Sequence, residues 1–394
     1  MWQVLSRRVS AWLQDPRILL GIYVLAASVV ALHKMAQGLF QSGGMVYPPY
    51  QNYVIFRNAF FHLLARQDLY AAYPLEQADL FKYSPTFALL MAPITALPYT
   101  LGAVVWNLVN ALALFGAVMW VPTLSARARI WTLWFVLLSL ISSMQTAQSN
   151  GLMAGLMLAA FAARERNRHA LSALSVVAAA LVKPFGGIAL VTCLARPGRG
   201  RFLAWMAGCG IVLCLAPLVV VPAGHLAFLY RSWFDLLRND HATKAGLSVM
   251  AWLEAWFGLA WPKDVVIAAG GLLLVLPMAR RSLVGDSGAR TLLTASVLIW
   301  VVIFNHMAES PTYVIAVVGV ALWYFSQPPT PLNTSLLVAT FLLTCLAATD
   351  LCPRDVRTRL IAPFVLKAVP CILVWLKLQH ELLARPRAAS RAPR

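Results

Sequence analysis

The chain has 394 residues, of which 60% are hydrophobic and 12% are charged. Soluble globular domains have about 45–50% apolar and about 25% charged residues, so this composition excludes an ordinary soluble protein and predicts an integral membrane protein. The formal net charge of +18 does not indicate nucleic-acid binding, because the arginines stand in short clusters between apolar segments, as they do in cytoplasmic loops. The six cysteines show no ligand spacing and predict neither a disulfide framework nor a metal site.

Twelve apolar segments predict membrane-spanning helices, since about 17–25 predominantly apolar residues are needed to cross the hydrocarbon core. The clear segments are 18–36, 101–121, 202–222, 291–305, 311–327, 331–349 and 361–378, and the shorter ones are 130–144, 150–163, 169–182, 185–195 and 265–279. No small-residue cleavage site follows the first segment, so we expect it to be retained. The predicted fold is all-α, a polytopic membrane protein of about 12 transmembrane helices in a single integral domain, residues 1–394.

Twelve crossings place the basic clusters on one side of the membrane together with both termini, except for the cluster at 354–359. The positive-inside rule makes that side the cytoplasm. We therefore expect a multi-pass protein of the cell (inner or plasma) membrane with both termini cytoplasmic and a basic tail at 379–394.

A polar interval follows the first apolar segment and predicts an extracytoplasmic loop at 45–83. Within it, apolar residues recur at helical spacing between Tyr53 and Leu64, which predicts an interfacial helix. An amphipathic helix that only packs against the protein would show the same pattern.

Two further apolar segments, 84–97 and 247–261, do not fit the count of crossings. If either crossed the membrane, the basic loops after it would change sides. We predict that both are re-entrant or interfacial helices on the outer face, the second within an outer loop at 224–264. Irregular backbone at membrane depth needs surrounding protein or a wet cavity, and a groove for a polar headgroup would provide one.

Several polar groups could carry chemistry. Asp68, Glu76 and Asp79 lie within twelve residues, and a carboxylate near an apolar interface can act as a base, although Asp68 could equally cap the loop. Lys183 precedes a proline that breaks an apolar run, so its ammonium group could bind a phosphate or extend to the interface.

Two polar junctions between apolar segments complete the set of candidates. The first holds Gln148 and Asn150, whose amides could bind a sugar or simply form a turn. The second holds His306 beside Glu309, and a histidine there could bind phosphate, transfer a proton or serve the structure. The sequence contains no P-loop, GxGxxG or HExxH motif, which disfavours a nucleotide-driven pump.

The order of the motifs resembles a known family. The residues that carry the resemblance are Asn52-Tyr53-x-x-Phe56, Gln67-Asp68-Leu69-Tyr70, Tyr83-Ser84-Pro85-Thr86-Phe87, Pro93 with Leu97-Pro98, Trp106-Asn107, Gln148-Ser149-Asn150-Gly151, Ala178 to Pro184, Ser248 with Leu253, and His306 to Tyr313. Over roughly residues 45–315 they are similar to glycosyltransferase family 87. The resemblance implies a GT-C architecture and an α-mannosyltransferase that uses polyprenyl-phosphate-mannose, with an active site facing away from the cytoplasm.

The resemblance also implies roles. The family's first-loop aspartate, which acts as the base, aligns with Asn52 here, and an amide can position a hydroxyl but cannot take its proton. Asp68 or Asp79 would then be the base, while Asn52 and Gln148 hold hydroxyls. The donor would bind through Lys183 and His306 at its phosphate, and through Asn150, Tyr53 and Tyr83.

The predicted function is transfer of a hexose, with mannose as the expected sugar, from a polyprenyl-phosphate carrier to an acceptor at the extracytoplasmic face. The expected partners are the polyprenyl-phosphate sugar donor, a lipid or glycan acceptor and membrane lipids, with no cofactor, metal or nucleic acid. The alternatives are a lipid-linked-sugar transporter or flippase and a non-catalytic partner in envelope assembly. A transporter would show two pseudo-symmetric halves, and no such repeat of hydropathy is evident.

Overall fold

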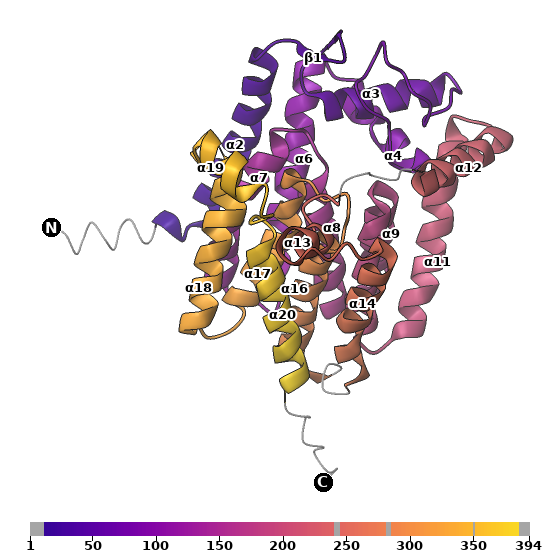
Figure 1. Cartoon of the computed structure of the whole chain (residues 1–394). Helices are drawn as coiled ribbons and strands as arrows, with labels where there is room; N and C mark the ends of the chain where they lie inside the picture. The colour runs from indigo at the N-terminus through magenta and orange to yellow at the C-terminus, as the bar shows by residue number, and fades with distance from the viewer. Residues whose placement is uncertain (1–11, 240–244, 281–284, 350, 386–394) are drawn as a thin grey trace.

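The computed structural model describes residues 12–239, 245–280, 285–349 and 351–385. Its regular structure is almost entirely helical, which confirms the predicted all-α class (Figure 1). The only strands among the described residues, β1 (Phe40–Ser42) and β2 (Met45–Tyr47), form one antiparallel hairpin. This hairpin was not predicted from the sequence.

The long helices and a few shorter ones form one bundle, and each of the twelve predicted apolar segments overlaps a helix. The bundle helices are α2 (Pro16–Ala36), α6 (Tyr99–Trp120), α7 (Ala126–Met144), α8 (Asn150–Glu165), α9 (His169–Val182), α10 (Leu190–Leu194), α11 (Arg199–Leu215), α14 (Lys263–Val275), α16 (Ser287–Ile303), α17 (Tyr313–Phe325), α18 (Pro331–Ala339) and α20 (Val369–Ala384). Short 3-10 or π turns adjoin several of them: η1 (Pro184–Ala189), η2 (Ala216–Val219), η3 (Leu276–Ala279), η4 (Ser310–Thr312), η5 (Thr340–Cys345) and η6 (Leu346–Ala348). A further π turn, η7 (Arg357–Ile361), precedes α20.

Among the described residues, four helical segments are long and apolar enough to cross a membrane on their own, namely 16–36, 99–120, 199–219 and 331–348. Four shorter apolar segments are 169–182, 184–194, 287–303 and 310–325. One membrane crossing takes about 17–25 residues. The segments 169–182, 184–194 and 310–325 are shorter than that, as expected of helices that are broken or continued by irregular backbone. The chain is a polytopic membrane protein.

In the described part of the chain, six further helices lie outside the bundle: α3 (Gln51–Leu64), α4 (Pro85–Leu90), α5 (Ala92–Thr95), α12 (Ala223–Asn239), α13 (Val249–Phe257) and α19 (Arg354–Val356). Among them, α3, α4 and α12 lie at one end of the bundle, here called the loop end (Figure 1). The helix predicted between Tyr53 and Leu64 is present as α3. In the segments 84–97 and 247–261 the structure has only the short helices α4, α5 and α13, none of which could cross a membrane alone.

The outer loop predicted at 224–264 contains the seventeen-residue helix α12, which the sequence analysis did not predict. At the other end of the chain, α20 runs to Ala384, so a helix covers the first residues of the predicted basic tail. The rest of that tail, 386–394, lies outside the described residues.

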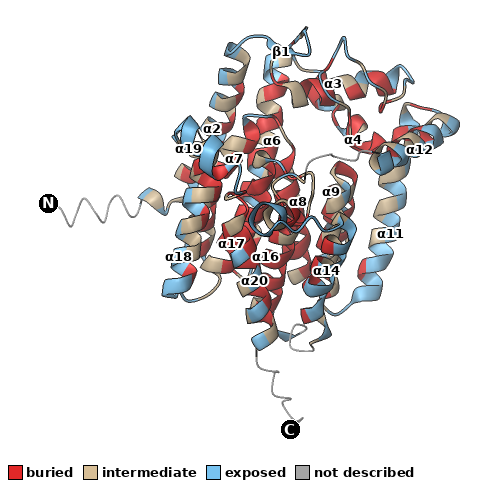
Figure 2. Ribbon diagram, in the orientation of Figure 1, coloured by how far each residue is buried: buried red, intermediate tan, exposed pale blue. Residues whose placement is uncertain are grey.

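The core of the bundle is formed by α8, α16 and α17, whose residues are mostly buried (Figure 2). Peripheral helices carry exposed apolar side chains; on α11, Ile211 and Val212 are 62% and 68% exposed. Hydrocarbon can solvate such side chains, so their exposure is consistent with helices that face lipid.

Close helix contacts in the core depend on small residues. A Cβ atom added to Gly155 of α8 would lie 2.7 Å from the backbone carbon of Ala113 on α6. Small residues at such positions let helix backbones approach and pack closely, which is the main source of helix association in membranes. These contacts place the start of α8 beside α6 at the loop end.

A buried ion-pair cluster connects α8, α16 and the segment after α10 at the opposite end of the bundle. The Glu165 carboxylate at the end of α8 accepts from Arg290 of α16 at 2.6 Å and lies 3.3 Å from Arg196. The Glu165 and Arg290 side chains are only 6% and 8% exposed. Removing one partner of a buried pair leaves an uncompensated charge and costs about 3–5 kcal/mol.

Glu165→Gln should therefore lower the free energy of unfolding by at least about 3 kcal/mol, measured by denaturant titration in mixed micelles. Asp286→Asn is the matched control, because it removes the exposed Asp286–Arg385 pair and keeps a capping side chain. Exposed pairs contribute about 0–1 kcal/mol, so the control should lose less than about 1 kcal/mol. Equal losses in the two variants would contradict this assignment.

Candidate functional site

A cavity of about 340 Å³ opens at the loop end of the bundle. Segments far apart in the sequence supply its walls: α3, the first loop, the turn before α8, the break after α9 and the junction before α17. The polar or charged residues that line it are Asn52, Asp79, Lys82, Tyr83, Gln148, Lys183, Asn305, Glu309 and Thr312.

Lys183 lies where the chain reverses between two helices. Pro184 disfavours an α conformation at the residue before it, and Lys183 is extended, with φ −140° and ψ 127°. The chain then folds back as η1, and a Cβ on Gly186 would lie 2.6 Å from the Ala179 carbonyl oxygen. This reversal fixes the half-buried Lys183 at the cavity wall.

The Lys183 ammonium begins a line of polar contacts. Its Nζ donates to Asn150 Oδ1 at 2.9 Å, and Asn150 Nδ2 donates to Gln148 Oε1 at 2.7 Å. Gln148 Nε2 in turn donates to Glu309 Oε2 at 2.7 Å. The line joins the helix break, the start of α8 and the junction before α17, so it sets the shape of the cavity.

Glu309 was not among the site residues predicted from the sequence. Its junction was singled out for His306, and an acidic residue three positions further was visible in the same stretch. The contact with Gln148 spans 161 residues, so no local pattern indicates it.

Asn52 and Asp79 lie at the α3 side of the cavity. Asn52 Nδ2 donates to the Thr146 carbonyl at 2.7 Å, which ties the start of α3 to the end of α7. The backbone N–H of Ala78 donates to Gln51 Oε1 at 3.2 Å, so the loop segment carrying Asp79 lies against the first turn of α3. The exposed Asp79 carboxylate accepts from the Leu80 N–H at 2.7 Å.

Tyr83 lines the cavity from a buried aromatic cluster. Its ring stacks on Phe87 with a centroid distance of 4.6 Å, and the Ser149 hydroxyl donates to its oxygen at 3.3 Å. The Lys183 Nζ lies 5.8 Å from the ring centroid, within the range of a cation–π contact.

Asp68, a predicted base, does not line the cavity. The Ser232 hydroxyl of α12 lies 2.9 Å and 3.0 Å from its two carboxylate oxygens, and the Tyr70 N–H donates to it at 3.1 Å. Burial raises the pKa of Tyr70, so that hydroxyl stays protonated and donates to the Tyr83 carbonyl at 2.9 Å. Asp68 therefore connects the first loop to α12.

Tyr53 and His306 are also absent from the cavity lining. Tyr53 is buried beside Tyr99, with a centroid distance of 5.3 Å. His306 is half-buried between Asn305 and Met307, which both line the cavity, and its carbonyl oxygen would lie 2.6 Å from a Cβ on Gly246.

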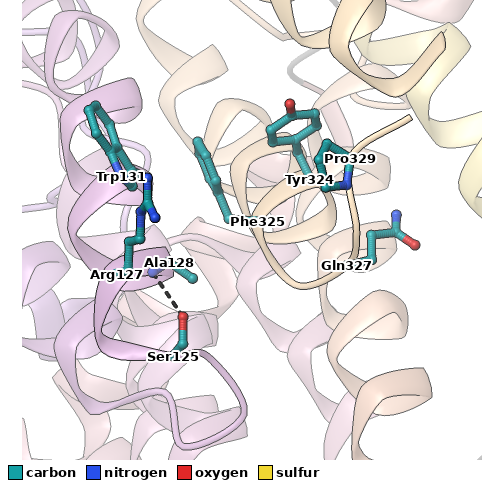
Figure 3. Close-up of a pocket in the computed structure, with 8 residues that line it drawn as sticks. All are labelled: Ser125, Arg127, Ala128, Trp131, Tyr324, Phe325, Gln327 and Pro329. Atoms are coloured by element: carbon teal, nitrogen blue, oxygen red, sulfur yellow. Dashed lines mark hydrogen bonds between the residues drawn. The ribbon is translucent and has the colours of Figure 1, made fainter. Parts of the chain in front are cut away.

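A second cavity, of about 330 Å³, lies between the start of α7 and the end of α17, away from all the predicted site residues (Figure 3). Its lining includes Arg127, Trp131, Tyr324 and Phe325, and Ser125 there caps α7 by accepting from the Ala128 N–H.

Within the described ranges, no group of three or more His, Cys, Asp or Glu residues could hold a metal ion. The loop-end cavity offers two lysine ammonium groups, side-chain amides and two carboxylates for its chemistry.

The fold and this cavity define a polytopic membrane protein with a polar site at one end of its helical bundle. The family model of glycosyltransferase family 87 matches residues 81–349, which is more than half of the chain. The chain belongs to glycosyltransferase family 87, and it is a membrane glycosyltransferase.

No curated protein matches the chain. Among solved structures, the crystal structure of ArnT from Cupriavidus metallidurans bound to undecaprenyl phosphate is similar, at 14% sequence identity and a TM-score of 0.45. The match covers 93% of this chain and 77% of that one.

The position of Tyr53 can be tested through its neighbour on α6. A Cβ at Gly102 would clash with the Tyr53 hydroxyl and lie 2.9 Å from the Ile94 carbonyl oxygen. Gly102→Ala should therefore lower the free energy of unfolding by about 1–3 kcal/mol through overpacking. In Gly116→Ala, on the same helix, the Cβ meets nothing within 4 Å, and we expect equal or higher stability. Thermal unfolding in detergent would measure both variants, and an undisturbed Gly102→Ala protein would contradict this packing.

Proposed function

We propose that the protein transfers a hexose, most simply mannose, from a polyprenyl-phosphate carrier to a hydroxyl group of an acceptor at the extracytoplasmic face of the cell membrane. The observation that carries the proposal is one cavity that combines the Lys183 ammonium group, side-chain amides and the carboxylates of Asp79 and Glu309. Membership of glycosyltransferase family 87 supports the reaction class. The GT-C architecture, the mannose donor and the cytoplasmic location of both termini belong to the same proposal.

Lys183 is the group proposed to bind the donor phosphate. An ammonium group that lines a cavity beside apolar helices is favoured when an anion occupies that cavity. Its hydrogen-bond partner, Asn150, is a neutral amide, and the Glu309 carboxylate is bonded to Gln148 instead. A phosphate would therefore be the anion in direct contact with Lys183. Electrostatic stabilisation by such a preplaced cation lowers the barrier to departure of the phosphate.

Asp79 is the group proposed to act as the base. It lies beside the first turn of α3, where Asn52 can orient a hydroxyl but cannot remove its proton. In the reaction the acceptor oxygen bonds to the anomeric carbon and its proton passes to Asp79. The bond between that carbon and the phosphate oxygen breaks, and its electron pair leaves with the polyprenyl phosphate.

Glu309 receives a different role because of where it lies. Its carboxylate accepts from Gln148, in the line of contacts that begins at Lys183. We assign it to positioning Gln148, which would hold a sugar hydroxyl of the donor. Asp68 is not assigned as the base, because its carboxylate is bound by Ser232 outside the cavity.

Incubation of the purified protein and membrane lipids with a panel of radiolabelled polyprenyl-phosphate sugars tests the proposed reaction. We expect transfer of label from one hexose donor to a lipid or glycan product. A complete absence of transfer across the panel would overturn the proposed function.

Asp79→Asn should lower kcat for this transfer by about 10²–10⁴-fold, the usual contribution of a general base. The matched control is Glu76→Gln in the same loop, since Glu76 bonds to His62 and does not line the cavity. The control should retain activity within a factor of two to three. Normal turnover in Asp79→Asn would remove this residue from the base role.

Lys183→Ala should lower kcat/KM for the donor by roughly 10- to 100-fold, because a hydrogen bond to a charged group contributes about 1.5–3 kcal/mol. It should also weaken binding of decaprenyl phosphate, measured by the ligand's effect on thermal unfolding. Lys263→Ala, at the start of α14 and outside the cavity lining, is the control. Unchanged binding in Lys183→Ala would show that the phosphate lies elsewhere.

A further inference from the structure

Another polar cavity, of about 380 Å³, lies at the same loop end. The end of α2, the first strand, the start of α3 and the end of α7 form its walls. Its lining residues are Lys34, Gln37, Gly38, Leu39, Phe40, Pro49, Tyr50, Gln51, Asn52, Gln145 and Thr146. Asn52 also lines the cavity that contains Lys183, so this side chain belongs to the wall of both.

The two cavities differ in their chemistry. The cavity at α2 is lined by four side-chain amides, one ammonium group and one threonine, and no carboxylate stands among its described lining residues. Each amide both donates and accepts hydrogen bonds, as sugar hydroxyls do. The Lys183 cavity contains two carboxylates, and an ionised carboxylate can accept hydrogen bonds but cannot donate them. The amide-lined cavity is therefore suited to bind a hydroxyl-rich group, but no carboxylate in the described part of its wall could remove a proton from that group.

Hydrogen bonds to α6 and to the end of α7 hold the start of α3, which forms the wall between the two cavities. Tyr50 precedes α3 in the left-handed region, with φ 73°, a conformation that costs a non-glycine residue free energy. Its hydroxyl bonds to Asn107 at 2.8 Å and to the Met144 carbonyl, and Asn52 donates to the Thr146 carbonyl. These contacts fix the start of α3 against α6 and α7, so Asn52 stays at the boundary.

We propose that the amide-lined cavity is the acceptor subsite and takes the hydroxyl-rich headgroup of a glycan or glycolipid. The reacting hydroxyl would pass Asn52 into the neighbouring cavity, where Asp79 takes its proton. An anionic group on the same headgroup would meet the Lys34 ammonium group, which donates to Gln37 Oε1 at 2.9 Å. This inference rests on the proposed function, and it adds where the acceptor binds and of what chemical class it is.

The test blocks the cavity and follows how the donor sugar is divided between acceptor and water. With the labelled polyprenyl-phosphate hexose that the wild-type protein uses, transfer to membrane glycan and release of free sugar are measured in the same vesicles. Gln37→Trp fills the cavity, and Gln41→Trp is the matched control, an exposed glutamine four residues further along that does not line it. The ratio of transfer to hydrolysis should fall at least tenfold in Gln37→Trp and stay within twofold in Gln41→Trp.

Gln145→Trp, which blocks the cavity from the α7 side, should lower the ratio in the same way. It keeps the test decisive if Gln37→Trp fails to fold, as judged by size-exclusion chromatography. Label recovered in the organic phase identifies a lipid-anchored acceptor, and label in the aqueous phase identifies a soluble glycan. Both products support the subsite.

An unchanged ratio in two folded blocking variants would overturn the acceptor subsite. So would an equal loss of transfer and hydrolysis in them. A wild-type protein that neither transfers nor hydrolyses any donor would instead refute the proposed function, so the two failures are distinguishable.

Discussion

Pro184 ends α9 at Val182, because the residue before a proline avoids the α conformation. The chain must then turn back toward the other end of the bundle, and it does so as η1 and α10, packed against α9. Backbone groups freed at such a break are tolerated at membrane depth only beside protein or a polar cavity. The helix break therefore requires the cavity beside it. Lys183 belongs to both, because it is the first residue after α9 and its side chain lines the cavity.

The line of contacts from Lys183 to Glu309 shows how the cavity is assembled. Its four members come from three places in the chain, and their hydrogen bonds replace water that the apolar helices exclude. The small residues of α8 let its first turn lie against α6, so that Asn150 faces the helix break. Packing in the middle of the bundle thus positions the polar groups at its end.

The sequence predicted the helices better than it predicted the site. Each apolar segment overlaps a helix, because hydropathy over about 20 residues is a local property of the chain. The hairpin around Gly43-Gly44 and the helix α12 carry little of that signal and were missed. Asn52, Asp79 and Lys183 do line one cavity, but the placement of Asp68 depends on Ser232, which is 164 residues away. Glu309 was missed for the same reason, since its contact with Gln148 is set by tertiary packing alone.

The asparagine at position 52 can be understood from the two cavities that it separates. A base at that position would have to face both the acceptor and the donor, whereas an amide can donate to one and accept from the other without a change of charge. The loop contact between Ala78 and Gln51 brings Asp79 to the same wall from the side of the Lys183 cavity, the proposed donor site. Moving the carboxylate from the helix to the loop would keep a base within reach of the hydroxyl while leaving the described lining of the proposed acceptor cavity without a carboxylate. An asparagine in place of the aspartate that the resemblance implies is therefore compatible with the proposed reaction, provided that the loop segment at Asp79 stays in contact with α3.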